Sequence, residues 1–369
     1  MTTTSDFSLG VEEEFFLVDA ETGALVPGID RVLDAAGAED TDDLEPELQR
    51  WQVETATRVC TTLTEVRTEL LGLRAHLLAA AATVGYRIVA TGTHPLATSA
   101  DIAITPKARY LHMAREFGEL ARDQLVCGCH VHVSIADREL AVQVMNRVRL
   151  WSAPLLALAG NSPYWKGSDT GYSSYRSQMW NRWPTAGPPE VFASRAEYDA
   201  VVGSLVSSGA IPDLGMVYLD VRPSRTYETL EFRATDVCLA VDDAVLVAGL
   251  CRALARTEAE AALREQALPA VRPELLRAAA WRAARSGLEG ELIDVASGRP
   301  VPAPDLLGAL VAHVRPALEA HGDLDEVEAL LAQTLGRGSG AARQRSAFRR
   351  RGRLEDVALL LADETVREA

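Results

Sequence analysis

Alternating apolar and polar positions predict strands in the first two-thirds of the chain. Residues 8–18 alternate around acidic positions, and residues 130–135 alternate polar with apolar side chains, as a strand with one polar face does. The apolar run at 86–92 predicts a buried strand. Two further strands are expected at 217–224 and 228–236, joined by a short turn.

Apolar positions at helical spacing predict the helices. Residues 62–84 repeat apolar side chains with helical periodicity after threonines that can cap a helix. Helices are also expected at 107–125 and 137–159, and from residue 239 the helical pattern continues almost to the end, with a break near 298–304. This distribution indicates an α+β fold with a mainly antiparallel sheet, and a parallel sheet is the alternative because helices alternate with the strands.

The stretch from 160 to 190 is rich in Gly, Ser and Pro and has no periodicity. It carries six aromatic residues: Tyr164, Trp165, Tyr172, Tyr175, Trp180 and Trp183. Long irregular loops in compact domains are commonly functional or disordered, and the aromatic content argues against disorder. Because no repeat or low-complexity linker divides the chain, we expect one domain over 1–369, strand-rich over 7–236 and helical over 239–369.

The charge balance is acidic. The 369 residues include 37 Lys+Arg and 52 Asp+Glu, a net charge of −15. Nucleic acids and anionic membranes need a basic surface, so we expect neither as a partner. Lys107 and Lys166 are the only lysines, and they precede Ala108 and Gly167, so the sequence has no P-loop, which requires Gly-Lys followed by Ser or Thr.

The cysteine pattern fits a reducing compartment. Five cysteines are scattered along the chain: Cys60, Cys127, Cys129, Cys238 and Cys251. An odd, dispersed set does not form a disulfide framework. The first residues lack the basic and apolar regions of a signal peptide, and no apolar run approaches the roughly 20 residues that span a bilayer. We therefore expect a soluble, cytoplasmic protein.

Three consecutive acids mark the first strand. Glu12 and Glu14 point to one face of a strand and Glu13 to the other. Two carboxylates on one face amid apolar neighbours raise each other's pKa unless a cation lies between them, and carboxylate oxygens are the ligands that Mg²⁺ prefers. The alternative is an exposed acidic strand end.

Two histidines share a face of a later strand. His130 and His132 follow Cys127 and Cys129, which suggests a zinc site. Zinc-binding cysteine pairs are normally separated by two to four residues, however, and the single Gly128 between these cysteines makes a poor chelate. The histidines are therefore either functional or simply buried and hydrogen-bonded.

Acidic and arginine side chains alternate near the end of the strand-rich part. Glu231 and Arg233 share a strand face close to Arg222, whereas Glu228 lies on the opposite face of a regular strand. Such neighbours form a plain salt bridge or a nucleotide site, in which the acid holds a metal and Arg binds phosphate. Glu54, in a strand-like run before a helix, is a weaker candidate of the same kind.

The C-terminal part carries six arginines within eleven residues: Arg343, Arg345, Arg349, Arg350, Arg351 and Arg353. A cluster of this kind can bind nucleic acid or polyphosphate. The acidic charge of the whole chain and the helical context favour a solvated or interface-facing helix instead. The preceding GRGSG (336–340) lacks a following Lys and is a weak phosphate-loop signal.

Four motifs in a fixed order resemble a known family. They are G-x-E-x-E at 10–14, V-E-T-A-T at 53–57, H-V-H-V-S at 130–134 and L-E-F-R at 230–233, and N-S-P-Y-W (161–165) and Y-R-S-Q-M-W (175–180) accompany them. From about residue 7 to the C-terminus the sequence resembles the carboxylate–amine ligases, also called type-2 glutamate–cysteine ligases, of the glutamine-synthetase-like superfamily.

The resemblance implies a fold and a reaction. The fold is a curved, mainly antiparallel sheet, backed by helices, whose concave face holds ATP and two or three Mg²⁺ or Mn²⁺ ions. ATP phosphorylates a carboxylate, typically the γ-carboxylate of glutamate, and an amine, typically that of cysteine, attacks the acyl phosphate. ADP and phosphate are released.

The resemblance also implies roles for particular residues. We place Glu12, His130 and Glu231 around one metal ion and Glu14 with Glu54 around another. Glu54, His132 and Arg233 are expected to act in catalysis, with His132 contacting substrate or nucleotide, and Arg222 and Arg233 are expected to bind phosphate. The aromatic loop is our candidate for amino-acid binding, through Ser173, Ser174, Arg176 and Trp180.

Several alternatives remain open at the level of sequence. The same mechanism can serve a different amine or carboxylate, or the scaffold can bind ATP or a metabolite without catalysis. A zinc hydrolase built on the histidines and cysteines is a third alternative. The long apolar helices after residue 239 leave room for a subunit interface, and we expect a homodimer.

Overall fold

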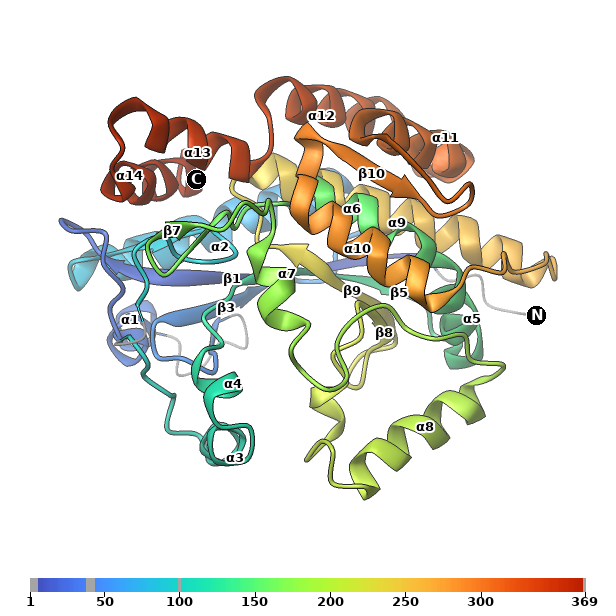
Figure 1. The fold of residues 1–369 in the computed structure, drawn as a ribbon, viewed down its shortest axis with the longest axis horizontal. Coiled ribbons are helices and arrows are strands. Elements are labelled where there is room, and N and C mark those ends of the chain that lie inside the picture. Colours follow the sequence, from blue (N-terminus) through green and yellow to red (C-terminus); the bar gives the residue numbers. More distant parts are fainter. Residues whose placement is uncertain (1–5, 38–43, 99–100, 368–369) are drawn as a thin grey trace.

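One antiparallel sheet of seven strands organises the molecule (Figure 1). A computed structural model describes residues 6–37, 44–98 and 101–367. The strands are β1 (Leu9–Asp19), β2 (Leu44–Pro46), β3 (Gln52–Ala56), β4 (Tyr86–Val89), β5 (Gly128–Ser134), β8 (Val221–Pro223) and β9 (Thr229–Asp236). Their order is β2-β3-β1-β5-β9-β8, and β4 pairs with the second half of β1. Every pairing of this sheet among the described residues is antiparallel, which confirms the expected α+β class and excludes the parallel alternative.

Helices cover the sheet and extend the chain beyond it. They are α1 (Ile29–Ala36), α2 (Leu63–Thr83), α3 (Ala108–Glu116), α4 (Glu119–Arg122), α5 (Arg138–Val148), α6 (Ser152–Leu158), α7 (Tyr175–Trp180), α8 (Arg195–Ser207), α9 (Val241–Leu263), α10 (Pro273–Ser286), α11 (Ala303–His321), α12 (Leu324–Arg337), α13 (Gly340–Arg351) and α14 (Leu354–Thr365). Helices α2, α6 and α9 pack on one face of the sheet, and α10 to α12 stack on them. Helices α3, α4 and α8 lie on the other side (Figure 1).

The period-two pattern of β1 separates the two faces of the sheet. Leu9, Val11 and Glu13 are buried against the helices, whereas Gly10, Glu12 and Glu14 face the other side and are only half-buried. Burial of the apolar face against α9 supplies the main hydrophobic core, since α9 is buried along most of its length. The opposite face is thereby left to polar side chains.

Two predicted helices are interrupted. The helix expected at 107–125 divides into α3 and α4, and Gly118 between them has a φ of 57°, a conformation that favours glycine. The helix expected at 137–159 divides into α5 and α6 through a 3₁₀ turn at Arg149–Trp151. Pro154 has no N–H to donate to the carbonyl of residue 150, and the lost hydrogen bond favours a break in the α-helix at this point.

The remaining short elements lie in the connections. The expected break near 298–304 is a hairpin of β10 (Glu291–Asp294) and β11 (Arg299–Pro302). The irregular stretch 160–190 contains a small hairpin of β6 (Tyr164–Trp165) and β7 (Ser168–Asp169) followed by α7. Further 3₁₀ turns lie at Leu214–Met216 and Gly287–Glu289.

Several arginines of the C-terminal cluster form ion pairs. Arg343 binds Glu364 of α14, Arg345 binds Asp169 at 2.6 Å, and Arg351 binds Asp356. These contacts hold α13 against its neighbours, which favours a structural role for the cluster over polyphosphate binding. Within the described part of the chain, none of the helices combines the length and apolarity needed to cross a membrane. The five N-terminal residues, where we expect no signal peptide, lie outside the described ranges.

Candidate active site

The register of the central strands assembles a first acidic group. Glu12 on β1 lies opposite His130 on β5, and His132 lies opposite Glu231 on β9. Cross-strand neighbours on one face approach closely enough for their side chains to meet. One ligand atom each from Glu12, His130 and Glu231 lies within 4.8 Å of the other two. The structure therefore brings together the three residues that the sequence places around one ion.

A second acidic group lies beside the first. Glu14 on β1 is paired in register with Glu54 on β3, and Glu47 follows β2 in the adjoining loop. One carboxylate oxygen from each of these three residues lies within 4.8 Å of the other two. The sequence indicated Glu14 and Glu54 but missed Glu47. The one signal for Glu47 in the sequence is the pair of glutamates on either side of Pro46, a pattern that by itself is typical of an exposed turn.

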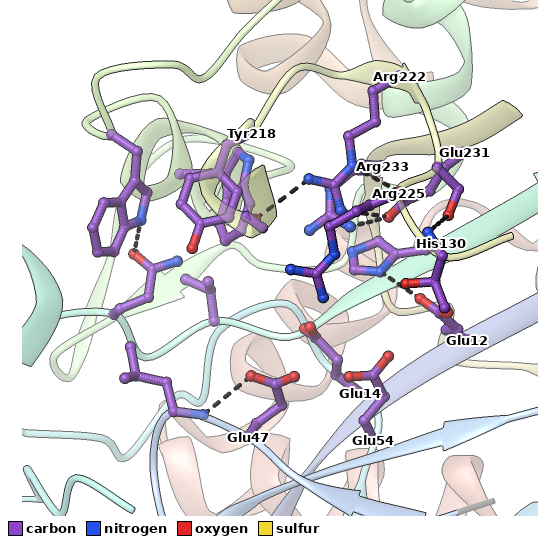
Figure 2. Close-up of a pocket in the computed structure, with 18 of the residues that line it drawn as sticks. Glu12, Glu14, Glu47, Glu54, His130, Tyr218, Arg222, Arg225, Glu231 and Arg233 are labelled. Carbon is purple, nitrogen blue, oxygen red and sulfur yellow. Dashed lines mark hydrogen bonds and ion pairs between the residues drawn. The ribbon is translucent and has the colours of Figure 1, made fainter. Parts of the chain in front are cut away.

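Both acidic groups open into one cavity of about 440 Å³ on the polar face of the sheet. Figure 2 shows Glu14, Glu47 and Glu54 along one wall and the side chains of Arg222, Arg225 and Arg233 opposite them, with Glu12 and Glu231 beside the arginines. Arg109 of α3 reaches the same cavity and is ion-paired with Asp213 at 2.9 Å. Aromatic side chains complete the lining: Tyr110, Trp180, Trp183, Tyr218 and Tyr227. The cavity thus combines an acidic floor with a basic rim.

Hydrogen bonds orient the histidines toward Glu12. His130 Nδ1 lies 3.2 Å from Glu12 Oε2, and His132 Nε2 lies 3.1 Å from Glu12 Oε1. The other nitrogen of His132 lies 2.9 Å from the hydroxyl of Thr229. Burial alone would raise the pKa of Glu12, but the hydrogen bonds with His130 and His132 outweigh it and hold the pKa well below its usual range. Glu12 is therefore a carboxylate at neutral pH.

Glu231 is held between two arginines. Arg222 Nε donates to Glu231 Oε2 at 2.7 Å, and Arg233 contacts the other carboxylate oxygen. Burial would raise the pKa of Glu231, but the charges of Arg233 and Arg222 hold it far below its usual range. Arg222 also donates to the carbonyl of Val217 at 2.7 Å. The two guanidinium groups are thereby fixed at the edge of the cavity.

The second acidic group is electrostatically unfavourable by itself. Burial and the nearby Glu47 raise the pKa of Glu14 to about 7. Burial, Glu47 and Glu12 likewise raise the pKa of Glu54 well above its usual range. Clustered carboxylates of this kind need a proton or a cation between them.

The donor sets fit divalent cations. The second group offers three carboxylates, and oxygen donors are the preference of Mg²⁺. The first group adds one imidazole to two carboxylates, the donors that suit Mg²⁺ and Mn²⁺. Among the described residues, His130 Nε2 is buried and has no hydrogen-bond partner, so a ring nitrogen remains free for a ligand.

The predicted substrate loop contributes in part. Trp180 lines the cavity, with its indole 5.6 Å from the Arg233 guanidinium and 4.6 Å from the Tyr218 ring. Ser174 is buried, caps α7 and donates to Asp236 Oδ1 at 2.7 Å. Ser173 is buried as well, and neither serine nor Arg176 is among the residues that line the cavity. The loop therefore presents Trp180 to the cavity, whereas the Ser174 side chain holds the loop and α7 in place.

The cysteines lie apart from both acidic groups. The thiols of Cys127 and Cys129 are fully buried, and burial raises the pKa of Cys127 well above its usual range. The potential metal-ligand groups among the described residues contain no cysteine. The arrangement therefore gives no support to a zinc site built on these thiols.

Comparisons with known proteins agree with this geometry. The profile of Glutamate-cysteine ligase family 2 (GCS2) matches residues 8–359. A Frankia alni protein named "Putative glutamate--cysteine ligase 2-2" is 48% identical over 380 residues, which cover 99% of this chain and 98% of that protein. A Saccharopolyspora erythraea protein named "Putative glutamate--cysteine ligase 2-1" is 45% identical over 364 residues, covering 98% and 95%.

A solved structure shares the fold. The crystal structure of the glutamate–cysteine ligase of Francisella tularensis in complex with AMP matches with a TM-score of 0.73 at 14% sequence identity. The match covers 98% of this chain and 89% of that chain. Because the family profile spans nearly the whole sequence and two relatives are similar over at least 95% of their length, the chain belongs to glutamate–cysteine ligase family 2.

Proposed function

We propose that the protein is an ATP-dependent carboxylate–amine ligase of the glutamate–cysteine type. It joins the γ-carboxylate of glutamate to an amine and releases ADP and phosphate. The observation that carries this proposal is the single cavity in which two acidic groups face Arg222, Arg225 and Arg233. The AMP complex of the similarly folded Francisella tularensis ligase supports nucleotide binding by this scaffold.

The cavity suits phosphoryl transfer. The substrate carboxylate attacks the γ-phosphorus of ATP, an oxygen–phosphorus bond forms, and the bond to ADP breaks. The transition state spreads negative charge over the phosphoryl oxygens, so catalysis depends on positioned cations. Arg233 and Arg222 meet this need because Glu231 holds both guanidinium groups in place.

The acidic groups are the proposed metal sites. Glu12, His130 and Glu231 would hold one Mg²⁺ or Mn²⁺ ion, and Glu14, Glu47 and Glu54 would hold another. Such ions supply positive charge to the phosphate oxygens. The addition of Glu47 distinguishes this proposal from the set expected from sequence.

Substrate positioning falls to the rim of the cavity. Arg225 lines the cavity in the turn between β8 and β9 and forms no ion pair within 4.0 Å among the described residues, so its guanidinium is available to an anionic substrate. Trp180 and Tyr218, whose rings lie 4.6 Å apart, form an aromatic wall of the same cavity. The amine then attacks the acyl phosphate in the same cavity, the amine loses a proton, phosphate leaves and an amide forms.

An ADP-release screen tests the proposal. The protein is supplied with Mg²⁺, ATP, glutamate and one amine at a time, and the γ-glutamyl product is identified by mass spectrometry. We expect ADP release that needs glutamate together with an amine, and cysteine as the preferred amine. A preference for another amine would identify a ligase of the same mechanism with a different substrate.

Matched variants separate the site from a contaminating activity. Glu14→Gln should abolish most product formation, whereas Glu228→Gln, an exposed position just before β9, should not affect it. ATP binding without ADP release in the presence of every carboxylate and amine pair would contradict the proposal and favour a binding protein.

A further inference from the structure

The guanidinium of Arg176 occupies the space where a side chain on Gly128 would lie. A β-carbon built on Gly128 would stand 2.2 Å from Nη2 of Arg176, 2.8 Å from its Cζ and 3.1 Å from its Nε. Gly128 is not among the glycines with positive φ, so its backbone conformation does not require glycine. A side chain at this position would therefore have to displace the guanidinium of Arg176.

The peptide of the same glycine holds Glu14. The Gly128 N–H donates to Glu14 Oε2 at 2.5 Å, and Glu14 belongs to the second acidic group. The hydrogen bond joins the first residue of β5 to β1 and fixes one oxygen of the carboxylate. Gly128 therefore binds Glu14 through its backbone N–H, and because it has no side chain it leaves room for Arg176.

Arg176 is a buried cation behind the cavity. It is 2% exposed, and its guanidinium forms no ion pair within 4.0 Å with the described residues. Its positive charge acts on three carboxyls, those of the half-buried Glu14 and of the buried Asp220 and Asp236. A buried guanidinium is costly unless its charge is compensated, and these are the acids on which its charge acts, although burial raises the pKa of Asp220 to about 7 and raises that of Asp236 as well.

Several contacts make the seat of Arg176 rigid. The Arg176 N–H donates to Ser162 Oγ at 3.0 Å, and that hydroxyl donates to Asp236 Oδ2 at 2.6 Å. Its Cζ lies 5.5 Å from the centre of the Trp180 ring, a cation–π contact. Asp236 is itself paired in register with Gly128. The backbone of Arg176 is thus held by hydrogen bonds, and its guanidinium lies between Gly128 of the sheet and Trp180 of α7.

We propose that Gly128 and Arg176 form a positioning pair that fixes Glu14 for the second metal site. The inference rests on the proposed function, because that function gives Glu14 its role as a metal ligand. It assigns Arg176 to the support of the site, in place of the substrate contact expected from sequence. It also explains the glycine between Cys127 and Cys129, since a larger residue would displace Arg176 and shift the peptide that holds Glu14.

Binding of Mn²⁺ to the protein without nucleotide tests the pair, and electron paramagnetic resonance reports both stoichiometry and affinity. Gly128→Ala keeps every charge and adds one methyl group. We expect it to weaken one of two Mn²⁺ sites about 10- to 100-fold, the range for a residue that orients a metal ligand. Gly72→Ala, at a helical position with open space around it, is the matched control and should bind Mn²⁺ as the wild type does.

A double variant tests whether Arg176 causes the loss of Mn²⁺ affinity in Gly128→Ala. Arg176→Lys keeps the positive charge but removes the planar head, so the added methyl group finds room. Gly128→Ala should therefore cost much less Mn²⁺ affinity in the Arg176→Lys background than in the wild type. An equal loss in both backgrounds, or no loss in either, would overturn the proposal.

Folding is followed in the same series by thermal unfolding. If Gly128→Ala alone does not fold, the double variant with Arg176→Lys should recover the fold. If neither variant folds, the added methyl group clashes with a group other than the Arg176 guanidinium, and the proposal is overturned. The proposed function is judged separately, because Mn²⁺ binding needs no turnover. If Mn²⁺ affinity depends on Gly128 and Arg176 as expected but the protein forms no amide, only the ligase assignment is contradicted. If the wild type binds no Mn²⁺, the positioning pair is contradicted even when ADP is released.

Discussion

Arg74 of α2 and Glu13 of β1 form a buried ion pair on the helix side of the strand that carries the acidic groups. Arg74 Nε lies 2.9 Å from one carboxylate oxygen and Nη2 lies 2.5 Å from the other, and both side chains are fully buried. The same guanidinium donates to the carbonyls of Cys238, Leu239 and Thr365. One arginine thus ties β1 to the chain before α9 and to the end of α14.

Loss of Arg74 should destabilise the whole fold. Arg74→Met leaves a buried carboxylate and several carbonyls without their donor, and we expect the free energy of unfolding to fall by about 3–5 kcal/mol. Adding Glu13→Leu should restore part of that loss because it removes the uncompensated charge. Urea unfolding measures both. Arg272→Met, which breaks an ion pair with side chains 81% and 59% exposed, is the control, and an equal loss in the control would contradict the argument.

The local pattern predicted the elements with strong periodicity. The alternation at 8–18 gave β1, and the apolar repeat at 62–84 gave α2, whose N-terminus carries a capping box of Thr62 and Glu65. Helix α8 escaped prediction because only Tyr198 and Val202 are buried along it, so its apolar stripe is narrow. The breaks inside 107–125 and 137–159 lie at single residues, Gly118 and Pro154, and a periodicity read over a whole segment does not detect them.

The candidate site was predictable where one strand supplies it. The shared faces of Glu12 with Glu14, and of His130 with His132, follow from the period of a strand. Which strands are neighbours is a tertiary property, so the register of Glu14 with Glu54 could not be derived from spacing. Glu47 stands in a loop and reaches the site only through the pairing of β2 with β3. Ser173 and Ser174 do not line the cavity, and the Ser174 hydroxyl bonds Asp236 and caps α7, a role that residue type alone does not distinguish from substrate binding.

Glu47 should matter as much as the acids expected from sequence. Glu47→Gln removes one of three carboxylates from the second acidic group, so we expect Mg²⁺-dependent turnover to fall by at least about 10- to 100-fold. The concentration of Mg²⁺ needed for half-maximal rate should rise as well. Glu45→Gln, an exposed position two residues earlier that does not line the cavity, is the control. Equal activity of the two variants would remove Glu47 from the metal site.

Arg233 should be sensitive even to lysine. Arg233 is buried, contacts Glu231 and lies over the Trp180 ring, so its planar fork is oriented toward the cavity. Arg233→Lys keeps the charge but loses this geometry, and we expect kcat to fall on the order of 10²–10³-fold. Steady-state kinetics with saturating ATP measure the loss. Arg350→Lys on the exposed side of α13 should have no effect, and near wild-type turnover of the Arg233 variant would exclude it as a phosphate clamp.

The cysteines should be dispensable for chemistry. Cys127 and Cys129 are fully buried, and no described metal-ligand group includes them. The double variant Cys127→Ala and Cys129→Ala should keep ATP-dependent ligation. It should lose some stability, because removal of two buried sulfur atoms leaves cavities that the surrounding side chains fill only in part. Elemental analysis of the wild type should find no stoichiometric zinc. Abolished ligation in a folded double variant would return the thiols to the mechanism.

His94 should make the fold sensitive to acid. Its side chain is fully buried next to the Phe16 ring, and burial lowers the pKa of His94 from 6.5 to about 3. Because the folded pKa lies below the unfolded one, the unfolded chain binds a proton first, so stability is complete above pH 6.5 and falls as the pH decreases. This single group should cost about 2 kcal/mol between pH 7 and pH 5.

A variant at this position separates its contribution from that of the other titrating groups. In His94→Asn the side-chain oxygen can accept from the Leu96 N–H, as His94 Nδ1 does at 3.3 Å, and no proton is taken up on unfolding. The free energy of unfolding, measured in urea from pH 7 to pH 5, should therefore decline less steeply by the amount assigned to His94. His76→Asn, on the exposed side of α2, should keep the slope of the wild type. Equal slopes in all three proteins would mean that His94 is protonated in the folded state or that its environment admits water.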